Sequence, residues 1–134
     1  MINTLIIEDN PEFRDAIKQL LTRNFPMIRV DVAKDGLEGF SKLADSSPDV
    51  IFMDIELPGE NGLELTRRIC GSYDGIDIVV ISNHDFPEYR QQAYRNGAGC
   101  FIAKSGNYCL ADILAWIEGA MVRKRATMNK QKMN

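Results

Sequence analysis

The stretch Val-Ile-Phe-Met-Asp-Ile-Glu-Leu-Pro-Gly-Glu-Asn-Gly, residues 50–62, carries the strongest structural signal in the chain. Its first four residues are all apolar, as in a strand of a parallel sheet that is buried on both faces. Asp54 follows directly, and Pro58, Gly59 and Gly62 after it predict a turn. The sequence therefore places one carboxylate at the carboxyl end of a buried strand, the edge where ligands bind in open α/β sheets.

Length and composition limit the class of protein. The chain has 134 residues, of which 45% are hydrophobic and 26% charged, which fits one globular domain with a single core. No apolar run approaches the roughly 20 residues of a membrane span, and the first residues lack the basic start of a signal peptide. We therefore expect a cytoplasmic protein without membrane contact.

Cys70, Cys100 and Cys109 have no metal-site spacing and are expected to be reduced thiols, with Cys100 buried in a strand.

The net charge of −3 is unevenly distributed. Residues 119–134 carry five basic and no acidic side chains, so the rest of the chain is strongly acidic. An acidic body with a short basic end does not fit a nucleic-acid-binding domain. We interpret residues 123–134 as a basic tail, either a solvated helix end followed by frayed chain or the remnant of a linker.

Strand-like and helix-like patterns alternate five times along the chain. The strand-like runs are residues 4–7, 28–32, 50–53, 76–81 and 100–103. The helices between and after them are predicted to start near Asn10, Asp35, Gly62, Pro87 and Asn107. This order predicts an α/β fold, a doubly wound (βα)5 domain whose five-stranded parallel sheet has helices on both faces. In the flavodoxin-like arrangement, which we expect here, the strands would have the order 2-1-3-4-5.

Polar side chains follow four of the predicted strands. Glu8 and Asp9 come after the first strand, Asp54 after the third, Ser82 after the fourth and Lys104 after the fifth. In the order 2-1-3-4-5 these side chains converge on one edge of the sheet. Three carboxylates in one small site need a counter-charge, which Mg²⁺ supplies through its preference for oxygen ligands. With the metal in place, the Asp54 carboxylate could attack a phosphoryl donor.

Taken together, these features resemble the receiver domain of two-component response regulators. The resemblance covers residues 3–122 and rests on the pair Glu8-Asp9 and on residues 53–62, 81–82 and 97–104. The residues around positions 81–82 and 103–105 are similar to receivers of LuxR-type regulators. We therefore expect a receiver domain over residues 1–122, with residues 123–134 as the tail.

The resemblance implies a role for each acidic residue of the site. Asp54 would be the phosphorylated aspartate. Asp9 and Asp54 would bind Mg²⁺ directly, Glu8 mostly through water, and the main-chain carbonyl of Glu56 would complete the protein ligands. The domain would be no enzyme beyond its own phosphotransfer and autodephosphorylation.

The resemblance also implies a partner and a switch. The phosphoryl donor would be a phosphohistidine on a sensor histidine kinase or a histidine phosphotransfer protein. Ser82 and Lys104 would bind the phosphoryl oxygens, and Phe101 would rotate as Ser82 moves. The face made of the fourth helix, the fifth strand and the fifth helix would then be remodelled for a partner or for a homodimer.

Four positions around the predicted site differ from the usual receiver pattern or vary within the family. Ser105 follows Lys104 where many receivers have proline, so the sequence does not decide between a cis and a trans peptide bond there. Asn83 stands where a small residue is usual. Glu56 and His84 occupy two variable positions that tune the lifetime of the phosphoryl group in the family, and we expect His84 to be a solvated loop residue.

Two other functions are weighed against phosphorelay signalling. A haloacid-dehalogenase-like phosphatase also phosphorylates an aspartate at a strand end, but that family expects a second Asp where this chain has Glu56, and an aspartate on the first strand. The other alternative is a receiver fold that serves only as an interaction module without phosphorylation. All of the predicted site residues are present in the sequence, which argues against a receiver that has lost phosphorylation.

Overall fold

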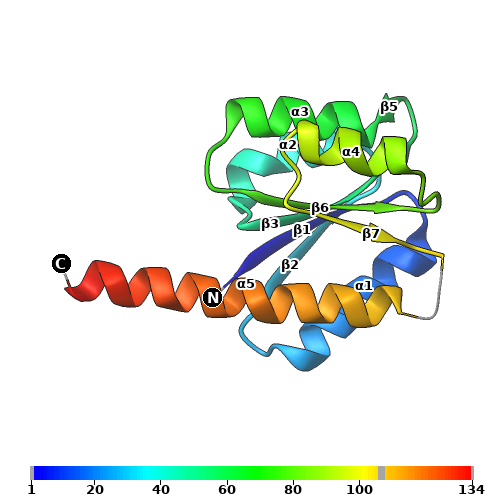
Figure 1. The fold of residues 1–134 in the computed structure, drawn as a ribbon. Helices are drawn as coiled ribbons and strands as arrows, with labels where there is room; N and C mark the ends of the chain where they lie inside the picture. The colour runs from blue at the N-terminus through cyan, green and yellow to red at the C-terminus, as the bar shows by residue number, and fades with distance from the viewer. Residues whose placement is uncertain (1, 106–107, 134) are drawn as a thin grey trace.

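The computed structural model describes residues 2–105 and 108–133 of the chain. Figure 1 shows one twisted sheet between two layers of helices, with α2, α3 and α4 on one face and α1 and α5 on the other. All neighbouring strands of this sheet run parallel, in the order β2-β1-β3-β6-β7. Because β4 and β5 lie outside this sheet, the order is the predicted 2-1-3-4-5, and the flavodoxin-like fold class is confirmed.

The strands of the sheet lie within one residue of the predicted bounds. They are β1 (Asn3–Ile7), β2 (Arg29–Ala33), β3 (Val50–Asp54), β6 (Asp77–Ser82) and β7 (Cys100–Ala103). Every residue of β3 is buried, whereas β2 lies at the edge and is largely half-exposed. The sequence did not predict the two-residue strands β4 (Glu56–Leu57) and β5 (Glu60–Asn61), which form a small antiparallel hairpin after β3.

The helices are α1 (Pro11–Asn24), α2 (Gly36–Ser46), α3 (Gly62–Ser72), α4 (Pro87–Arg95) and α5 (Cys109–Met133). The Asn10 side chain caps α1, and the Asp35 side chain caps α2 by accepting the Glu38 amide at 2.8 Å. These bonds satisfy amides that have no partner inside the helix. The predicted start of the fifth helix at Asn107 lies outside the described residues.

Two apolar clusters form the core, one on each face of the sheet. Leu5 and Ile7 of β1 point into the cluster under α2, α3 and α4. Ile6 points into the cluster under α1 and α5, where fully buried Phe52 meets the Trp116 ring edge-on at 6.5 Å between ring centres. Successive side chains of a strand point to opposite faces, so one continuous apolar run supplies both clusters.

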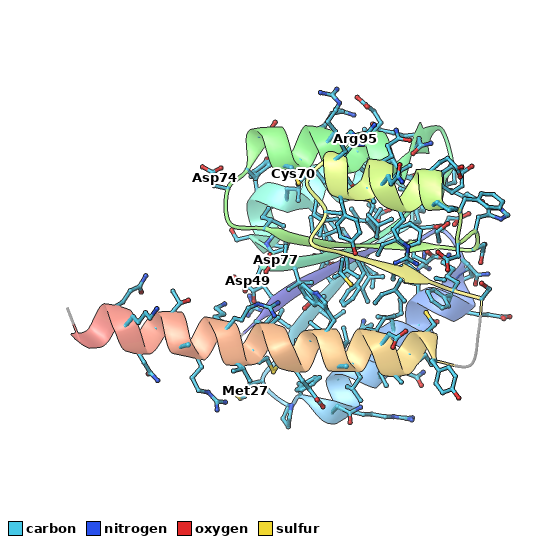
Figure 2. All side chains as sticks on the ribbon, viewed as in Figure 1. Met27, Asp49, Cys70, Asp74, Asp77 and Arg95 are labelled. Carbon is cyan, nitrogen blue, oxygen red and sulfur yellow. The ribbon has the colours of Figure 1, made fainter. Side chains whose placement is uncertain are left out.

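Helix α5 continues far beyond the sheet, as Figure 1 shows. The expected frayed chain after a helix end is wrong for the described residues, because the helix runs without interruption to Met133. Lys124 Nζ lies 2.7 Å from Asp49 Oδ2 and holds the helix against the amino edge of the sheet, where Figure 2 labels Asp49 beside α5. The domain boundary at residue 122 stays a prediction.

The cysteines are buried to different degrees than the sequence predicts. Cys100 is half-buried rather than buried, because it begins the edge strand β7, and Cys109 of α5 is the buried cysteine.

No helix formed by the described residues is long and apolar enough to cross a membrane.

Candidate functional site

The carboxyl ends of β1, β3, β6 and β7 meet at one edge of the sheet, as the predicted strand order requires. A pocket of about 350 Å³ opens there. Its walls are formed by Glu8, Asp9, Asn10, Phe13, Asp54, Glu56, Asn83 and Lys104. Ser82 lies beside it as the last residue of β6, buried, with its carbonyl accepting the Lys104 amide at 2.6 Å.

Three carboxylates converge in this pocket. One side-chain oxygen from each of Glu8, Asp9 and Asp54 lies within 4.8 Å of the others. Glu8 and Asp54 are only 2% and 3% exposed, whereas Asp9 is open to solvent. Clustered carboxylate oxygens are the ligands that a hard divalent cation prefers, so this donor set can hold such an ion.

Burial gives the Asp54 carboxyl an unusual proton affinity. Its pKa is raised to about 7, mainly because burial disfavours the charged form and secondarily because the Glu8 carboxylate repels a second negative charge. The Lys104 ammonium acts in the opposite direction but does not cancel these effects. The site therefore needs additional positive charge for Asp54 to be fully ionised near neutral pH.

The Lys104 ammonium pairs with both buried acids. Its Nζ lies 2.8 and 3.0 Å from the two Glu8 carboxylate oxygens and 3.3 Å from Asp54 Oδ1. Burial alone would lower the pKa of Lys104, but the hydrogen bond to Glu8 and the nearby negative charges outweigh it and raise that pKa. The Phe13 ring centre lies 4.8 Å from the same Nζ. The sequence did not reveal this contact, because Phe13 fits the apolar stripe of an amphipathic helix.

Tight backbone packing holds the turn after Asp54. The Gly62 amide donates to the Ile55 carbonyl at 2.8 Å, and the Glu56 amide lies 3.3 Å from Asp54 Oδ1. A Cβ atom at Gly62 would lie 1.9 Å from the Asp54 carbonyl oxygen, closer than any real contact. Only glycine fits there, so residues 50–62 form one unit that joins β3 to α3.

The loop after β6 links Ser82 to the opposite wall of the site. The His84 amide donates to Ser82 Oγ at 3.0 Å. The His84 ring stacks on Phe86, with 5.3 Å between ring centres, and its Nε2 lies 2.9 Å from Glu56 Oε1. His84 is exposed as expected, but it is also paired, and only the fold reveals that contact between two distant loops.

Two further predictions concern Phe101, the expected switch residue, and the peptide bond between Lys104 and Ser105. Phe101 is 5% exposed and packs in the cluster under α4, with the Arg90 guanidinium 4.7 Å from its ring centre. The described part of the chain contains no cis peptide bond, so the Lys104–Ser105 bond is trans.

A five-stranded parallel α/β domain with an acidic cluster and a lysine at its carboxyl edge defines a class of signalling domain, the receiver. The family model of the response regulator receiver domain matches residues 4–114, and the chain belongs to this family. The fold and the family thus confirm the resemblance seen in the sequence.

Named relatives and solved structures support the same assignment. The oxygen regulatory protein NreC of Staphylococcus carnosus is 34% identical over 102 residues, which cover 75% of this chain and 47% of NreC. A LuxR-family two-component response regulator from Aurantimonas sp. is 26% identical, with a TM-score of 0.81 over 91% of this chain and 86% of that one. The N-terminal domain of an uncharacterized Wolinella succinogenes protein is 28% identical, with a TM-score of 0.83 over 95% and 99%. The chain spans about half the length of the curated relatives it matches.

Proposed function

We propose that this receiver domain accepts a phosphoryl group on Asp54 in a Mg²⁺-dependent reaction and thereby switches a signalling output. The observation that carries the proposal is the position of the Asp54 carboxylate. It is buried at the carboxyl end of the central strand, opens into the pocket, and shares one acidic cluster with Glu8 and Asp9. A phosphohistidine on a sensor histidine kinase or a histidine phosphotransfer protein would be the donor.

The donor set fits Mg²⁺. Asp9 and Asp54 would bind the ion through carboxylate oxygens, Glu8 mostly through water, and Glu56 through its main-chain carbonyl. All of these are oxygen donors, as the ion requires. When bound, the ion supplies positive charge to the cluster and to the phosphoryl oxygens. The raised pKa of Asp54 supports the need for that charge.

The residues of the chain have distinct tasks in the transfer. An Asp54 carboxylate oxygen forms a bond to phosphorus while the bond from phosphorus to the donor imidazole nitrogen breaks, and the electron pair leaves with the imidazole. The Lys104 ammonium, 3.3 Å from Asp54 Oδ1, is close enough to stabilise the oxygens of the transferred group. Ser82 Oγ, at the end of the adjacent strand, would donate a further hydrogen bond.

The same contacts support a switch. Ser82 Oγ accepts the His84 amide in this structure, so a movement of Ser82 toward a phosphoryl oxygen would pull on the loop that leads into α4. Phe101 packs beneath that helix and would reorient as the loop moves. The face formed by α4, β7 and α5 would then bind a partner, an output domain or a second copy of the chain.

Two alternatives make different predictions. A receiver that serves only as an interaction module would take no phosphoryl group. The presence of Asp54, Ser82 and Lys104 at neighbouring strand ends supports phosphorylation over this alternative. A haloacid-dehalogenase-like phosphatase would turn over phosphate esters. The receiver family and the position of Asp54 on the third strand disfavour that interpretation.

The test is the intact mass of the protein after incubation with acetyl phosphate, with and without Mg²⁺. We expect one phosphoryl group that requires Mg²⁺ and is absent from Asp54→Asn, a nearly isosteric change that leaves the fold intact. Binding of beryllofluoride would reveal a functional site whose phosphoryl group is too short-lived to detect. A protein that binds neither group would support the interaction-module alternative.

A further inference from the structure

Phe13 forms the wall of the pocket beside Lys104. It lies in the first turn of α1, is half-buried, and packs against the apolar cluster under α1 and α5. Its ring centre is 4.8 Å from Lys104 Nζ, within the range of a cation–π contact. The ring thus joins the apolar core on one side to the ammonium on the other.

Local sequence fixes the position of this ring. Asn10 Oδ1 accepts the amides of Glu12 at 3.0 Å and of Phe13 at 3.1 Å, and Pro11 begins the helix. The backbone of Phe13 is therefore tied directly to the loop that carries Glu8 and Asp9. An aromatic side chain has only two side-chain torsions, so a fixed backbone and core packing leave it little freedom.

Lys104 needs such support. A lysine side chain has four rotatable bonds and loses much rotamer entropy when it is held in one place. Its Nζ contacts Glu8 and Asp54, which are the carboxylates that a bound cation would draw toward itself. The Phe13 ring, 4.8 Å from the same Nζ, gives this ammonium a contact that lies outside the acidic cluster.

We propose that Phe13 is a positioning residue for phosphotransfer, which holds the Lys104 ammonium over the pocket through its aromatic face when the carboxylates turn to a metal ion. This inference rests on the proposed function of Asp54. It assigns to Phe13 a role that its place in an amphipathic helix does not require, because a leucine would fill the same apolar stripe.

The test compares Phe13→Leu with Phe13→Tyr. Leucine keeps an apolar side chain at this position but has no aromatic face, whereas tyrosine keeps the face. We expect Mg²⁺-dependent phosphorylation by acetyl phosphate to be about 3- to 10-fold slower in Phe13→Leu, as the loss of a partly desolvated cation–π contact implies. Phe13→Tyr should stay within about 2-fold of the wild type.

A double variant distinguishes a positioning role of Phe13 from a role in packing. The phosphorylation rate of Lys104→Gln serves as the reference. Adding Phe13→Leu to this variant should not lower the rate further, because the ring then has no ammonium to hold. In NMR spectra, the Lys104 Cε protons should show an upfield ring-current shift that disappears in Phe13→Leu and persists in Phe13→Tyr.

Three outcomes would overturn the inference. Equal rates for the wild type and Phe13→Leu would remove Phe13 from the reaction and leave the proposed function intact. If Phe13→Leu lowered the phosphorylation rate equally in the wild type and in Lys104→Gln, the ring would act through packing alone. A wild-type protein that takes no phosphoryl group would overturn the proposed function itself and, with it, this role.

Discussion

The two edges of the same sheet hold their acidic residues in opposite ways. At the amino edge, the Asp49 carboxylate accepts the Asn3 amide at 2.8 Å and the Lys124 ammonium at 2.7 Å. At the carboxyl edge, the three clustered carboxylates lie beside the Lys104 ammonium, and two of them are almost completely buried.

This difference distinguishes a structural ion pair from a carboxylate cluster that could hold a metal ion. The side chains of Asp49 and Lys124 are 36% and 35% exposed and balance each other, so the pair stabilises the fold without any further group. The cluster at the carboxyl edge has an excess of negative charge that burial makes costly. The carboxyl edge, unlike the amino edge, therefore offers a cluster of carboxylate oxygens of the kind that can bind a cation.

The largest expected effect tests this contrast by metal binding. Asp9→Ala should weaken Mg²⁺ binding by roughly 10- to 100-fold, because it removes one of the clustered carboxylates. The matched variant Asp49→Ala, at the other edge, should leave the Mg²⁺ affinity unchanged. Isothermal titration calorimetry measures both. Equal losses in the two variants would show that general surface charge, and not the cluster, attracts the ion.

The next effect is on stability as a function of pH. Because the pKa of Asp54 is about 7 in the folded protein and 3.8 for an aspartate exposed to water, the folded protein holds this proton more tightly than the unfolded chain does. The resulting stabilisation is present below about pH 4 and is lost as the pH rises through about 7. Without Mg²⁺, Asp54→Asn should therefore be more stable than the wild type at pH 8, by roughly 2 kcal/mol.

Urea denaturation at pH 5 and pH 8 in the presence of a chelator measures this difference. The wild type should lose stability between the two values, and Asp54→Asn should lose less. The same pH dependence in both proteins would contradict the assignment of the titrating group to Asp54.

A smaller effect concerns a buried hydroxyl near the amino edge. Thr4 is only 2% exposed, and its side-chain hydroxyl has no hydrogen-bond partner among the described residues. Thr4→Val replaces this hydroxyl with a methyl group of similar shape and should stabilise the protein by about 1 kcal/mol. A decrease in the thermal midpoint would mean that the hydroxyl has a partner, such as a bound water.

The smallest effect is expected at the amino-edge ion pair. Lys124→Gln should destabilise the fold by about 0.5 kcal/mol, since the pair is partly exposed, and should loosen the extension of α5. Phosphorylation by acetyl phosphate should proceed at the wild-type rate. A slower reaction would mean that the two edges are coupled through α5, and the contrast between them would have to be revised.

The sequence was sufficient for the sheet and for the acidic site. Apolar runs, continuous in the buried strands and alternating at the edge, predicted the strands to within one residue, and the strand order brought Glu8, Asp9 and Asp54 together. The strands depend on periodicity, which local sequence encodes directly, and the strand order is that of the flavodoxin-like arrangement indicated by alternating strands and helices. The roles of these residues in phosphotransfer stay predictions.

A very short hairpin and several long-range contacts could not be predicted from the sequence. The hairpin of β4 and β5 has only two residues in each strand, too few for a periodic pattern. The extension of α5 lacks a continuous apolar stripe and is held by a contact between Lys124 and Asp49, 75 residues apart. The contact between His84 and Glu56 likewise joins two loops that only the fold brings together.

The most direct measurement is to locate the phosphoryl group itself. Protein treated with acetyl phosphate and Mg²⁺ would be reduced with borohydride, which converts an aspartyl phosphate to homoserine, and its peptides mapped by mass spectrometry. We predict homoserine at position 54 and at no other aspartate. Homoserine at Asp9 or Asp49 in place of Asp54 would contradict this prediction, because the charge excess at the carboxyl edge would then not mark the phosphoacceptor.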